Sequence, residues 1–281
     1  MKILMTGATS FVGRHLIKHL LDSGYEVFHI VRDTKGFDNE IVWDFNELIP
    51  KEVPLCDVIV HLAALVDFGL NLNLEQYKVN TVSTMRLSAH ARISNAHFIL
   101  ASMVGVHGYK YSQIDKDTPL SPENHYAMSK YLAEEVVKTF VDSYSILRIC
   151  GIYGIDGPSH LNLNKAITDA VRYKKPPVLY GSGNSRRNYI CVMDVVRWIM
   201  HLIKKHEGSS ILTAGNTQET LYLASPEIMT IEQYLQASID VVLPDKKIER
   251  KEGRESADMI VRPSDAPFRP VTFREYLSLI N

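Results

Sequence analysis

A turn flanked by glycines joins a short apolar run to a helical pattern at the start of the chain. Residues 2–5 form the run, Gly7 and Gly13 flank the turn, and apolar residues then recur at helical spacing. A second apolar run over 26–31 follows Gly24, which stands where a helix would end. This order predicts a βαβ unit. Backbone N–H groups and the helix dipole face an anion at such a turn, so it also predicts a pyrophosphate site.

The periodicity of the first half of the chain predicts one large sheet. Strand patterns alternate with helical stretches and fall at residues 2–5, 27–31, 58–62, 98–101 and 145–149. The alternation is typical of an α/β fold, a Rossmann-type doubly wound parallel sheet with ligands at the carboxyl ends of its strands. After about Gly151 connections rich in Pro and Gly become frequent. We therefore expect residues 1–150 to form a dinucleotide-binding Rossmann domain. Residues 151–281 should form a smaller C-terminal substrate-binding lobe, some of whose segments return to the Rossmann sheet.

Composition excludes several classes of protein. The 281 residues are 46% hydrophobic, which is enough for a large core, and the formal net charge is −1. That balance gives no electrostatic reason to expect nucleic acid or an acidic membrane as a partner. The three cysteines show no metal-ligand spacing, so we expect reduced core thiols, no metal and a cytoplasmic location. No signal peptide or membrane span is expected.

Tyr126 and Lys130 are the strongest candidates for chemistry. Four residues apart on a helix, they would share one face. A nearby ammonium favours the phenolate and lowers the pKa of a tyrosine, which then exchanges a proton with an alcohol or sugar oxygen. The spacing also arises by chance in many helices, so the pair gains its meaning from its surroundings.

Six segments, in order along the chain, resemble motifs of the extended short-chain dehydrogenase/reductase superfamily, especially its nucleotide-sugar epimerase and dehydratase branch. They include a turn similar to Thr-Gly-x-x-Gly-x-x-Gly, a strand ending His-x-Ala-Ala, a helix asparagine, the Tyr-x-x-x-Lys helix, a Leu-Arg-x-x-x-x-Tyr-Gly strand and a nucleotide-diphosphate loop. They lie at residues 6–13, 57–64, Asn80, 122–130, 147–154 and 179–195. The resemblance implies a nicotinamide cofactor, a nucleotide-sugar substrate and catalysis by Tyr126, Lys130 and a third hydroxyl.

The resemblance also implies the cofactor contacts. They come from the glycine turn, the ends of neighbouring strands and the catalytic helix: Gly7, Thr9, Ser10, Phe11, Val12, Gly13, Arg32, Asp44, Phe45, Leu62, Ala63, Ala64 and Lys130. Ser10 replaces the middle glycine of the turn, a change that we expect to be tolerated. Val31 and then Arg32 stand where NAD-preferring members carry an acid, and an arginine suits a 2′-phosphate. We therefore expect NADP, with NAD as the alternative if Asp33 holds the ribose diol.

The third catalytic hydroxyl is ambiguous in this sequence. A gap-free comparison with the family pattern places Met103 at its position, whereas one extra residue before Gly108 would place Ser102 there. We assign Ser102 as catalytic, because a thioether cannot donate a hydrogen bond, and Met103 as a substrate contact. The Asp-Glu pair that 4,6-dehydratases carry after this position is missing. What remains is hydride transfer at one carbon, either 4-keto reduction or 4-epimerisation.

The substrate contacts follow from the same resemblance. Arg187 and Arg262 stand where relatives reach the diphosphate, and Tyr153 belongs to the Tyr-Gly strand motif. Asn188 and Gly151 depart from the family pattern, which leaves the sugar open. The helices at 126–141 and from Asn80 to about residue 92 are those by which relatives dimerise, so a homodimer is possible.

Three functions are compatible with these residues. The leading one is an NADP-dependent nucleotide-sugar reductase or 4-epimerase. The alternative from another class is a cofactor-binding protein of the same fold with impaired catalysis that acts as a sensor or partner, an idea motivated by Ser10, Met103 and Asn188. A third is the reduction of a small ketone or aldehyde that carries no nucleotide.

Overall fold

A seven-stranded sheet is the largest sheet of the protein in a computed structural model that describes residues 1–45, 47–69, 71–207 and 216–281. The strand order is β12-β7-β5-β4-β1-β2-β3, and the pairs β1–β2, β1–β4, β2–β3 and β4–β5 are all parallel. The strands are β1 (Lys2–Thr6), β2 (Glu26–Val31), β3 (Glu40–Val42), β4 (Val58–His61), β5 (His97–Met103), β7 (Tyr144–Ile149) and β12 (Gln218–Leu223).

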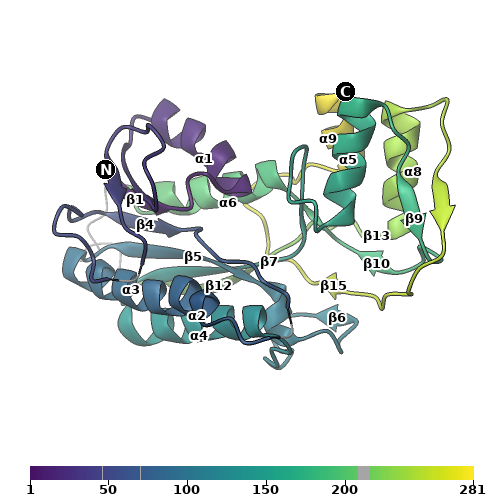
Figure 1. Cartoon of the computed structure of the whole chain (residues 1–281). Coiled ribbons are helices and arrows are strands. Elements are labelled where there is room, and N and C mark those ends of the chain that lie inside the picture. Colours follow the sequence, from purple (N-terminus) through teal and green to yellow (C-terminus); the bar gives the residue numbers. More distant parts are fainter. Residues whose placement is uncertain (46, 70, 208–215) are drawn as a thin grey trace. The chain divides into compact units, whose positions relative to one another are not determined.

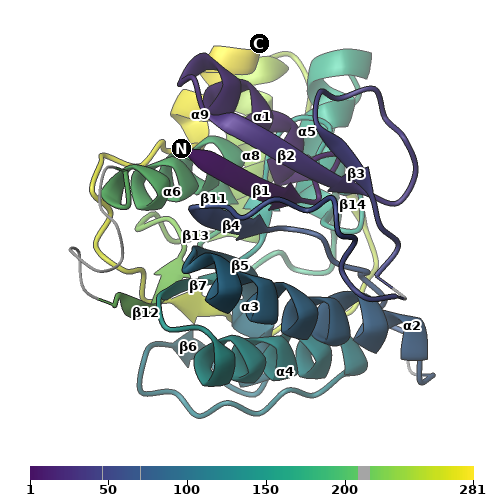
Figure 2. The same cartoon turned by 90° about the vertical axis from the view of Figure 1, so that its left-hand side faces the viewer.

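Helices cover both faces of this sheet. Helices α1 (Phe11–Asp22) and α6 (Val192–Lys205) lie on one face, and α3 (Ser83–Ser94) and α4 (His125–Phe140) lie on the other (Figures 1 and 2). Short elements connect them: helix α2 (Leu74–Tyr77), the π-helical turn η1 (Lys78–Val82) and the 3₁₀ turn η2 (Val104–His107). The doubly wound Rossmann-type fold expected from the sequence is confirmed.

The apolar patterns explain why these segments form strands. Ile3, Leu4 and Met5 of β1 are fully buried, as is every residue from Val58 to His61 in β4. Strands covered on both faces read as continuous apolar runs, which is the pattern of the sequence here. Gly24, just beyond α1, has a φ of +74°, the left-handed conformation that glycine adopts easily at a helix end.

The chain divides into two compact units. Unit 1 contains 1–108, 120–148 and 196–221, and unit 2 contains 109–119, 149–195 and 222–281. The order in which the chain adds strands to the sheet reverses at β1, because β2 and β3 lie on one side of β1 and β4 lies on the other. Such a switch point is where doubly wound sheets bind ligands.

Unit 2 contains three helices and short paired strands. The helices are α5 (Asn162–Tyr173), α8 (Ile231–Val242) and α9 (Phe273–Ile280). Their shared core includes Ile167, Ala237 and Phe273, all fully buried. The strand pairs are β15 (Ile260–Val261) with β6 (Gln113–Ile114), β11 (Ile190–Cys191) with β8 (Ile152–Tyr153), β14 (Glu249–Lys251) with β9 (Val178–Tyr180) and β10 (Arg186–Arg187) with β13 (Met229–Thr230).

Candidate active site

The N-terminal turns of α4 carry the Tyr126 and Lys130 pair. Asn124 caps the helix, since its side-chain oxygen accepts a hydrogen bond from the Ala127 N–H at 2.8 Å. Tyr126 is half-buried in the first turn, and the ring of Phe68 meets it edge to face with 5.3 Å between centroids. Lys130 follows one turn later, so the expected geometry of the pair on one helix face is present.

The ammonium of Lys130 is held in a buried environment. Lys130 is 2% exposed, and this burial lowers its pKa to about 8, while the nearby Glu134 carboxylate opposes the shift. Burial, together with the charge of this ammonium, lowers the pKa of His61 to about 3, so His61 is neutral. Its ring nitrogens contact the hydroxyls of Thr6 at 2.6 Å and Thr84 at 3.0 Å, which gives it a structural role.

Asn80 ties the loop after β4 to the catalytic helix. It is fully buried in the π-helical turn η1. Its amide exchanges hydrogen bonds with the backbone of Leu65 at 2.8 and 3.0 Å and donates to the Ser129 hydroxyl at 2.9 Å. Ser129 is the neighbour of Lys130, so this amide fixes the position of α4 relative to the loop that carries Phe68. Single π-turns within helices are frequent at functional sites.

The glycine turn fits a closely approaching phosphate. Gly7 has a φ of +74°, and a Cβ there would lie 2.6 Å from the Ala63 nitrogen. A Cβ at Gly13 would lie 2.1 Å from the Gly7 oxygen, so neither position accepts a side chain. Ser10 has a φ of −68° and caps α1 through its hydroxyl, which accepts from the Gly13 N–H at 3.1 Å. The serine is therefore tolerated because its backbone needs no positive φ.

The remaining cofactor candidates follow the ends of neighbouring strands. Arg32 comes directly after β2 and is exposed, and Asp44 and Phe45 follow β3. After β4, Leu62 and Ala63 donate backbone hydrogen bonds to Thr6, the last residue of β1. Thr9 lies in the turn after β1, Phe11 and Val12 are the first residues of α1, and Ala64 follows Ala63 in the segment after β4. The residues thus lie along the carboxyl edge of the sheet, where a dinucleotide binds in such folds.

The Ser102 hydroxyl is hydrogen-bonded to Glu134. Ser102 is 5% exposed near the end of β5, and its hydroxyl donates to Glu134 at 2.5 Å. A hydroxyl has one hydrogen to donate, so in this arrangement Ser102 acts within a buried cluster. Met103 is the last residue of β5 and is half-buried. Dehydratases would carry their acids at Met103 and Val104 if Ser102 is the catalytic hydroxyl, or at Val104 and Gly105 if Met103 holds that position; Val104 and Gly105 are buried in η2.

Asn188 organises the arginine segments of unit 2. It is 3% exposed; its amide donates to the carbonyls of Ser225 and Val261 at 2.9 and 2.7 Å and accepts from the Val261 N–H at 2.9 Å. These bonds hold together the segments that carry Arg187 and Arg262. The Arg187 guanidinium donates to the backbone carbonyl of Arg186 at 2.9 Å, and Arg262 is exposed.

The surroundings of Tyr153 and Gly151 could not be predicted from the family pattern. Tyr153 is 1% exposed and packs edge to face against Phe273 and Tyr276, which favours a core role over substrate contact. A Cβ at Gly151 would lie 2.5 Å from the ring of Tyr189. The tyrosine ring therefore fills the space that a larger side chain would need.

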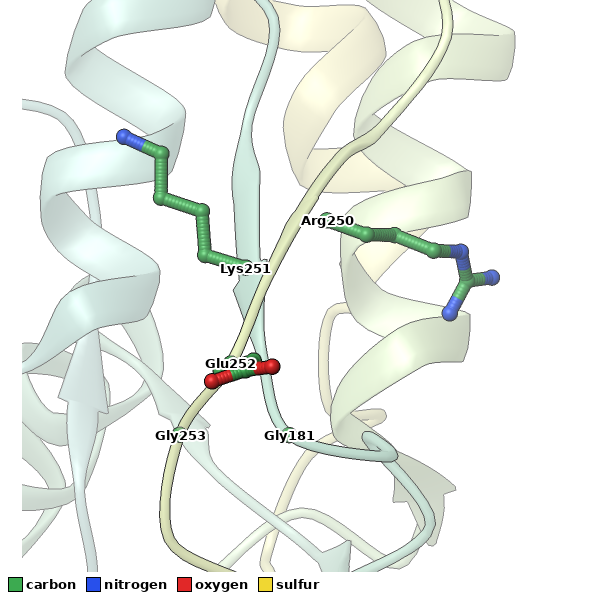
Figure 3. A pocket seen from close by; sticks show the side chains of 5 residues that line it. All are labelled: Gly181, Arg250, Lys251, Glu252 and Gly253. Atoms are coloured by element: carbon green, nitrogen blue, oxygen red, sulfur yellow. The ribbon is translucent and has the colours of Figure 1, made fainter.

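A shallow hollow of about 640 Å³ lies on unit 2. It is lined by Gly181, Arg250, Lys251, Glu252 and Gly253. Arg250 extends toward α8, where Glu232 accepts its hydrogen bond, whereas Lys251 extends in another direction (Figure 3). The two cations do not converge on one ligand, so we assign no site there.

Three residues of this region are not predicted as site residues from the sequence: Phe68, Glu134 and Arg148. Glu134 carries a detectable signal, since it follows Lys130 by four residues on the same helix. Arg148 lies in a matched motif, but its partner was not predictable. Phe68 carries no signal in the sequence, because its contact with Tyr126 depends on the path of the loop after β4.

The pattern of the NAD dependent epimerase/dehydratase family matches residues 3–215 of the chain. The chain belongs to this family. GDP-6-deoxy-D-talose 4-dehydrogenase from Aggregatibacter actinomycetemcomitans is 29% identical over 214 residues, 73% of this chain and 71% of that protein. Two predictions are thereby confirmed. The chain is an extended short-chain dehydrogenase/reductase, and it is an enzyme of the type that acts on nucleotide sugars. The sensor alternative is not favoured.

Solved structures share the fold over the whole chain. The UDP-glucuronic acid 4-epimerase of Bacillus cereus, solved with NAD, has a TM-score of 0.80 at 21% identity, covering 99% of this chain and 94% of that one. The UDP-glucose 4-epimerase of Thermotoga maritima, solved with UDP-glucose, has a TM-score of 0.79 at 20% identity, covering 100% and 97%. Membership of the NAD dependent epimerase/dehydratase family supports a nicotinamide dinucleotide cofactor.

Two further observations concern the described residues of this family member. None of its described helices has the length and hydropathy that crossing a membrane requires. Within the same ranges, no three His, Cys, Asp or Glu side chains are grouped so that they could hold a metal ion.

Proposed function

We propose that this enzyme is an NADP-dependent nucleotide-sugar oxidoreductase that moves one hydride and one proton at one carbon, as a 4-keto reductase or a 4-epimerase. The observation that carries the proposal is the Tyr126 and Lys130 pair at the start of α4, with its ammonium buried. Two relatives support it, because the names 4-dehydrogenase and 4-epimerase both refer to carbon 4 of a sugar joined to a nucleotide.

Each residue has a defined part in this chemistry. A bound nicotinamide cofactor supplies or accepts the hydride. The Tyr126 hydroxyl donates a proton to the sugar oxygen during reduction and takes one from it during oxidation. The Lys130 ammonium holds the nicotinamide ribose and favours the phenolate form of Tyr126. Met103, Val104 and Gly105 offer no acid in either alignment, so loss of water from the sugar is not part of the proposal.

The cofactor preference rests on Arg32. It is exposed directly after β2, where a guanidinium can pair with a 2′-phosphate. The Ser10 hydroxyl accepts from Gly13, which leaves its own hydrogen to donate to a phosphate oxygen. NAD is the competing cofactor, since the structures of relatives from Bacillus cereus and others contain it.

The substrate and assembly complete the proposal. Arg187 and Arg262 are the candidates for the nucleotide diphosphate, because a guanidinium fork matches phosphate oxygens. Ser102 and Met103 at the end of β5, and Tyr153, stay predictions as site residues.

Large apolar side chains are exposed on α3 and α4, namely Met85, Ile93, Leu132 and Phe140, which supports a homodimer through these helices. Light scattering measures this directly. Three free cysteines support a cytoplasmic location.

The test is stopped-flow absorbance of the nicotinamide with NADPH or NADH and a panel of dTDP-, UDP- and GDP-linked 4-keto sugars. We expect oxidation of NADPH with at least one of them. Tyr126→Phe should lower turnover by roughly 10²–10⁴-fold, because the proton donor is lost. Tyr131→Phe, on the same helix but on another face, is the matched control and should leave turnover unchanged.

The outcomes separate the candidate reactions. No oxidation of NADPH, together with interconversion of UDP-sugars at carbon 4, would assign the enzyme as an epimerase. Full turnover by the Tyr126→Phe variant would contradict the proposed chemistry. Turnover that is insensitive to Arg187→Ala would instead indicate a small ketone or aldehyde as substrate.

A further inference from the structure

A buried charged cluster surrounds Glu134, one helical turn beyond Lys130. Glu134 is fully buried, and its carboxylate accepts hydrogen bonds from the Arg148 guanidinium at 2.7 Å (Nη2 to Oε2) and at 3.2 Å from Nε to each oxygen. The Ser102 hydroxyl donates to its Oε1 at 2.5 Å. Ser102 comes from β5 and Arg148 from β7. One carboxylate therefore connects the catalytic helix to two strands of the sheet.

The position of Glu134 on the helix places it in line with the catalytic pair. Tyr126, Lys130 and Glu134 follow each other at intervals of four residues, so they share one face of α4. The Glu134 carboxylate is the acidic group that raises the pKa of Lys130 against the effect of burial. A buried carboxylate is costly unless it is paired and hydrogen-bonded, and here it is satisfied by Arg148 and Ser102.

Three other titratable side chains lie near this face of α4, and each has a contact of its own. His61 of β4 is neutral and bonded to two threonines. His107 of η2 contacts the Arg148 Nη1 at 3.3 Å. Lys138 of α4 lies 3.7 Å from Glu134 and 2.8 Å from Glu135. The cluster thus places Glu134 between the cations of Arg148, Lys138 and Lys130.

We propose that Glu134 is a positioning residue for the Tyr126 and Lys130 pair: clamped by Arg148 and Ser102, it fixes this face of α4 against the sheet and keeps a compensating negative charge one turn from Lys130. The proposal rests on the proposed roles of Tyr126 and Lys130. Ser102 then belongs to the clamp, because its hydrogen is donated to Glu134. Strand β5, which carries Ser102, then contributes to the chemistry by positioning α4.

The experiment follows the Lys130 side chain itself in the full-length enzyme. Protein labelled with ¹³C-lysine is titrated by NMR, and the Lys130 Cε signal is assigned with Lys130→Arg. In Glu134→Gln, which keeps the shape of the side chain, we expect the titration midpoint of Lys130 to fall by ~1 pH unit. The alkaline limb of kcat should move in the same direction, with KM nearly unchanged.

Glu135→Gln is the matched control. Glu135 is the adjacent residue and also pairs with Lys138, but its side chain is 46% exposed and lies on another face of α4. This variant should leave the Lys130 titration unchanged. A role confined to folding would lower Tm in Glu134→Gln without moving the midpoint, and that result would overturn the proposal.

A second variant covers the case in which Glu134→Gln does not fold. Glu134→Asp keeps the charge but withdraws it by one methylene, so the Lys130 midpoint should move in the same direction by a smaller amount; no movement would overturn the proposal. Because the NMR titration needs no turnover, a wild-type protein that neither reduces nor epimerises any nucleotide sugar contradicts the proposed function and leaves the Lys130 titration as a separate test of this inference.

Discussion

Lys130 is a cation in a place that disfavours cations. Its side chain is almost fully buried, and this burial lowers its pKa from 10.5 to about 8. Below about pH 8 the folded and unfolded states both carry the charge, so the folded state bears the whole cost of removing it from water. As the pH rises from about 8 through 10.5 the cost disappears. A residue that lowers stability while carrying the chemistry is a common compromise at active sites.

We therefore expect Lys130→Met to be more stable than the wild type and inactive. Methionine fills a similar volume without a charge, so at pH 7 the free energy of unfolding should rise by about 1–3 kcal/mol. Urea unfolding at pH 7 measures this, and the advantage should shrink as the pH is raised above about 8. A variant less stable than the wild type at pH 7 would show that the ammonium is stabilising where it lies.

At the scale of elements, the glycine turn and α1 show how one residue replaces another in a motif. Gly7 and Gly13 cannot carry a side chain, whereas Ser10 adopts an ordinary φ of −68° and caps the helix. The family pattern has glycine at this position, but the turn does not need its conformational freedom. The hydroxyl instead satisfies the Gly13 N–H, one of the unpaired donors at the start of the helix.

Ser10→Ala should accordingly cost about 1 kcal/mol of the free energy of unfolding, because a capping hydrogen bond is lost. Ser10→Gly, the residue of the family pattern, should cost only a few tenths of a kcal/mol. Urea unfolding of the two variants side by side provides the measurement. No loss in Ser10→Ala would mean that the hydroxyl contributes nothing as a cap.

The elements of the sheet were largely predictable, and the partners within the site were not. The ends of the predicted strands at 2–5, 27–31, 58–62, 98–101 and 145–149 lie within two residues of the observed ends of β1, β2, β4, β5 and β7. Strands buried on both faces are apolar runs, so local sequence identifies them. The bonds of Ser102 to Glu134 and of Asn188 to Val261 join residues far apart in the chain. No local pattern encodes such contacts.

At the scale of the whole molecule, two buried histidines make the stability of unit 1 depend on pH. His61 is enclosed between Thr6 and Thr84, and burial holds its pKa at about 3. His97 bonds the hydroxyls of Ser143 and Ser145 at 2.8 and 3.0 Å. Burial, with the nearby His206 and Lys205, lowers its pKa to about 2. Both rings are neutral in the folded protein, whereas both are protonated below about pH 6.5 in the unfolded chain.

The sign of the effect follows from proton binding. Between pH 6.5 and about 3 the unfolded state binds more protons than the folded state, so stability falls as the solution is acidified. From pH 6.5 to 5.5 the two histidines together should remove about 2 kcal/mol from the free energy of unfolding of unit 1.

His97→Gln should remove about half of this dependence, whatever its stability at neutral pH. Urea unfolding at several pH values gives both slopes, and equal slopes for the variant and the wild type would show that His97 is not a proton-linked group. Ser145 also donates to Glu219 at 2.8 Å, so Ser145→Ala is the control that disturbs the same cluster without removing a titrating ring and should keep the wild-type slope.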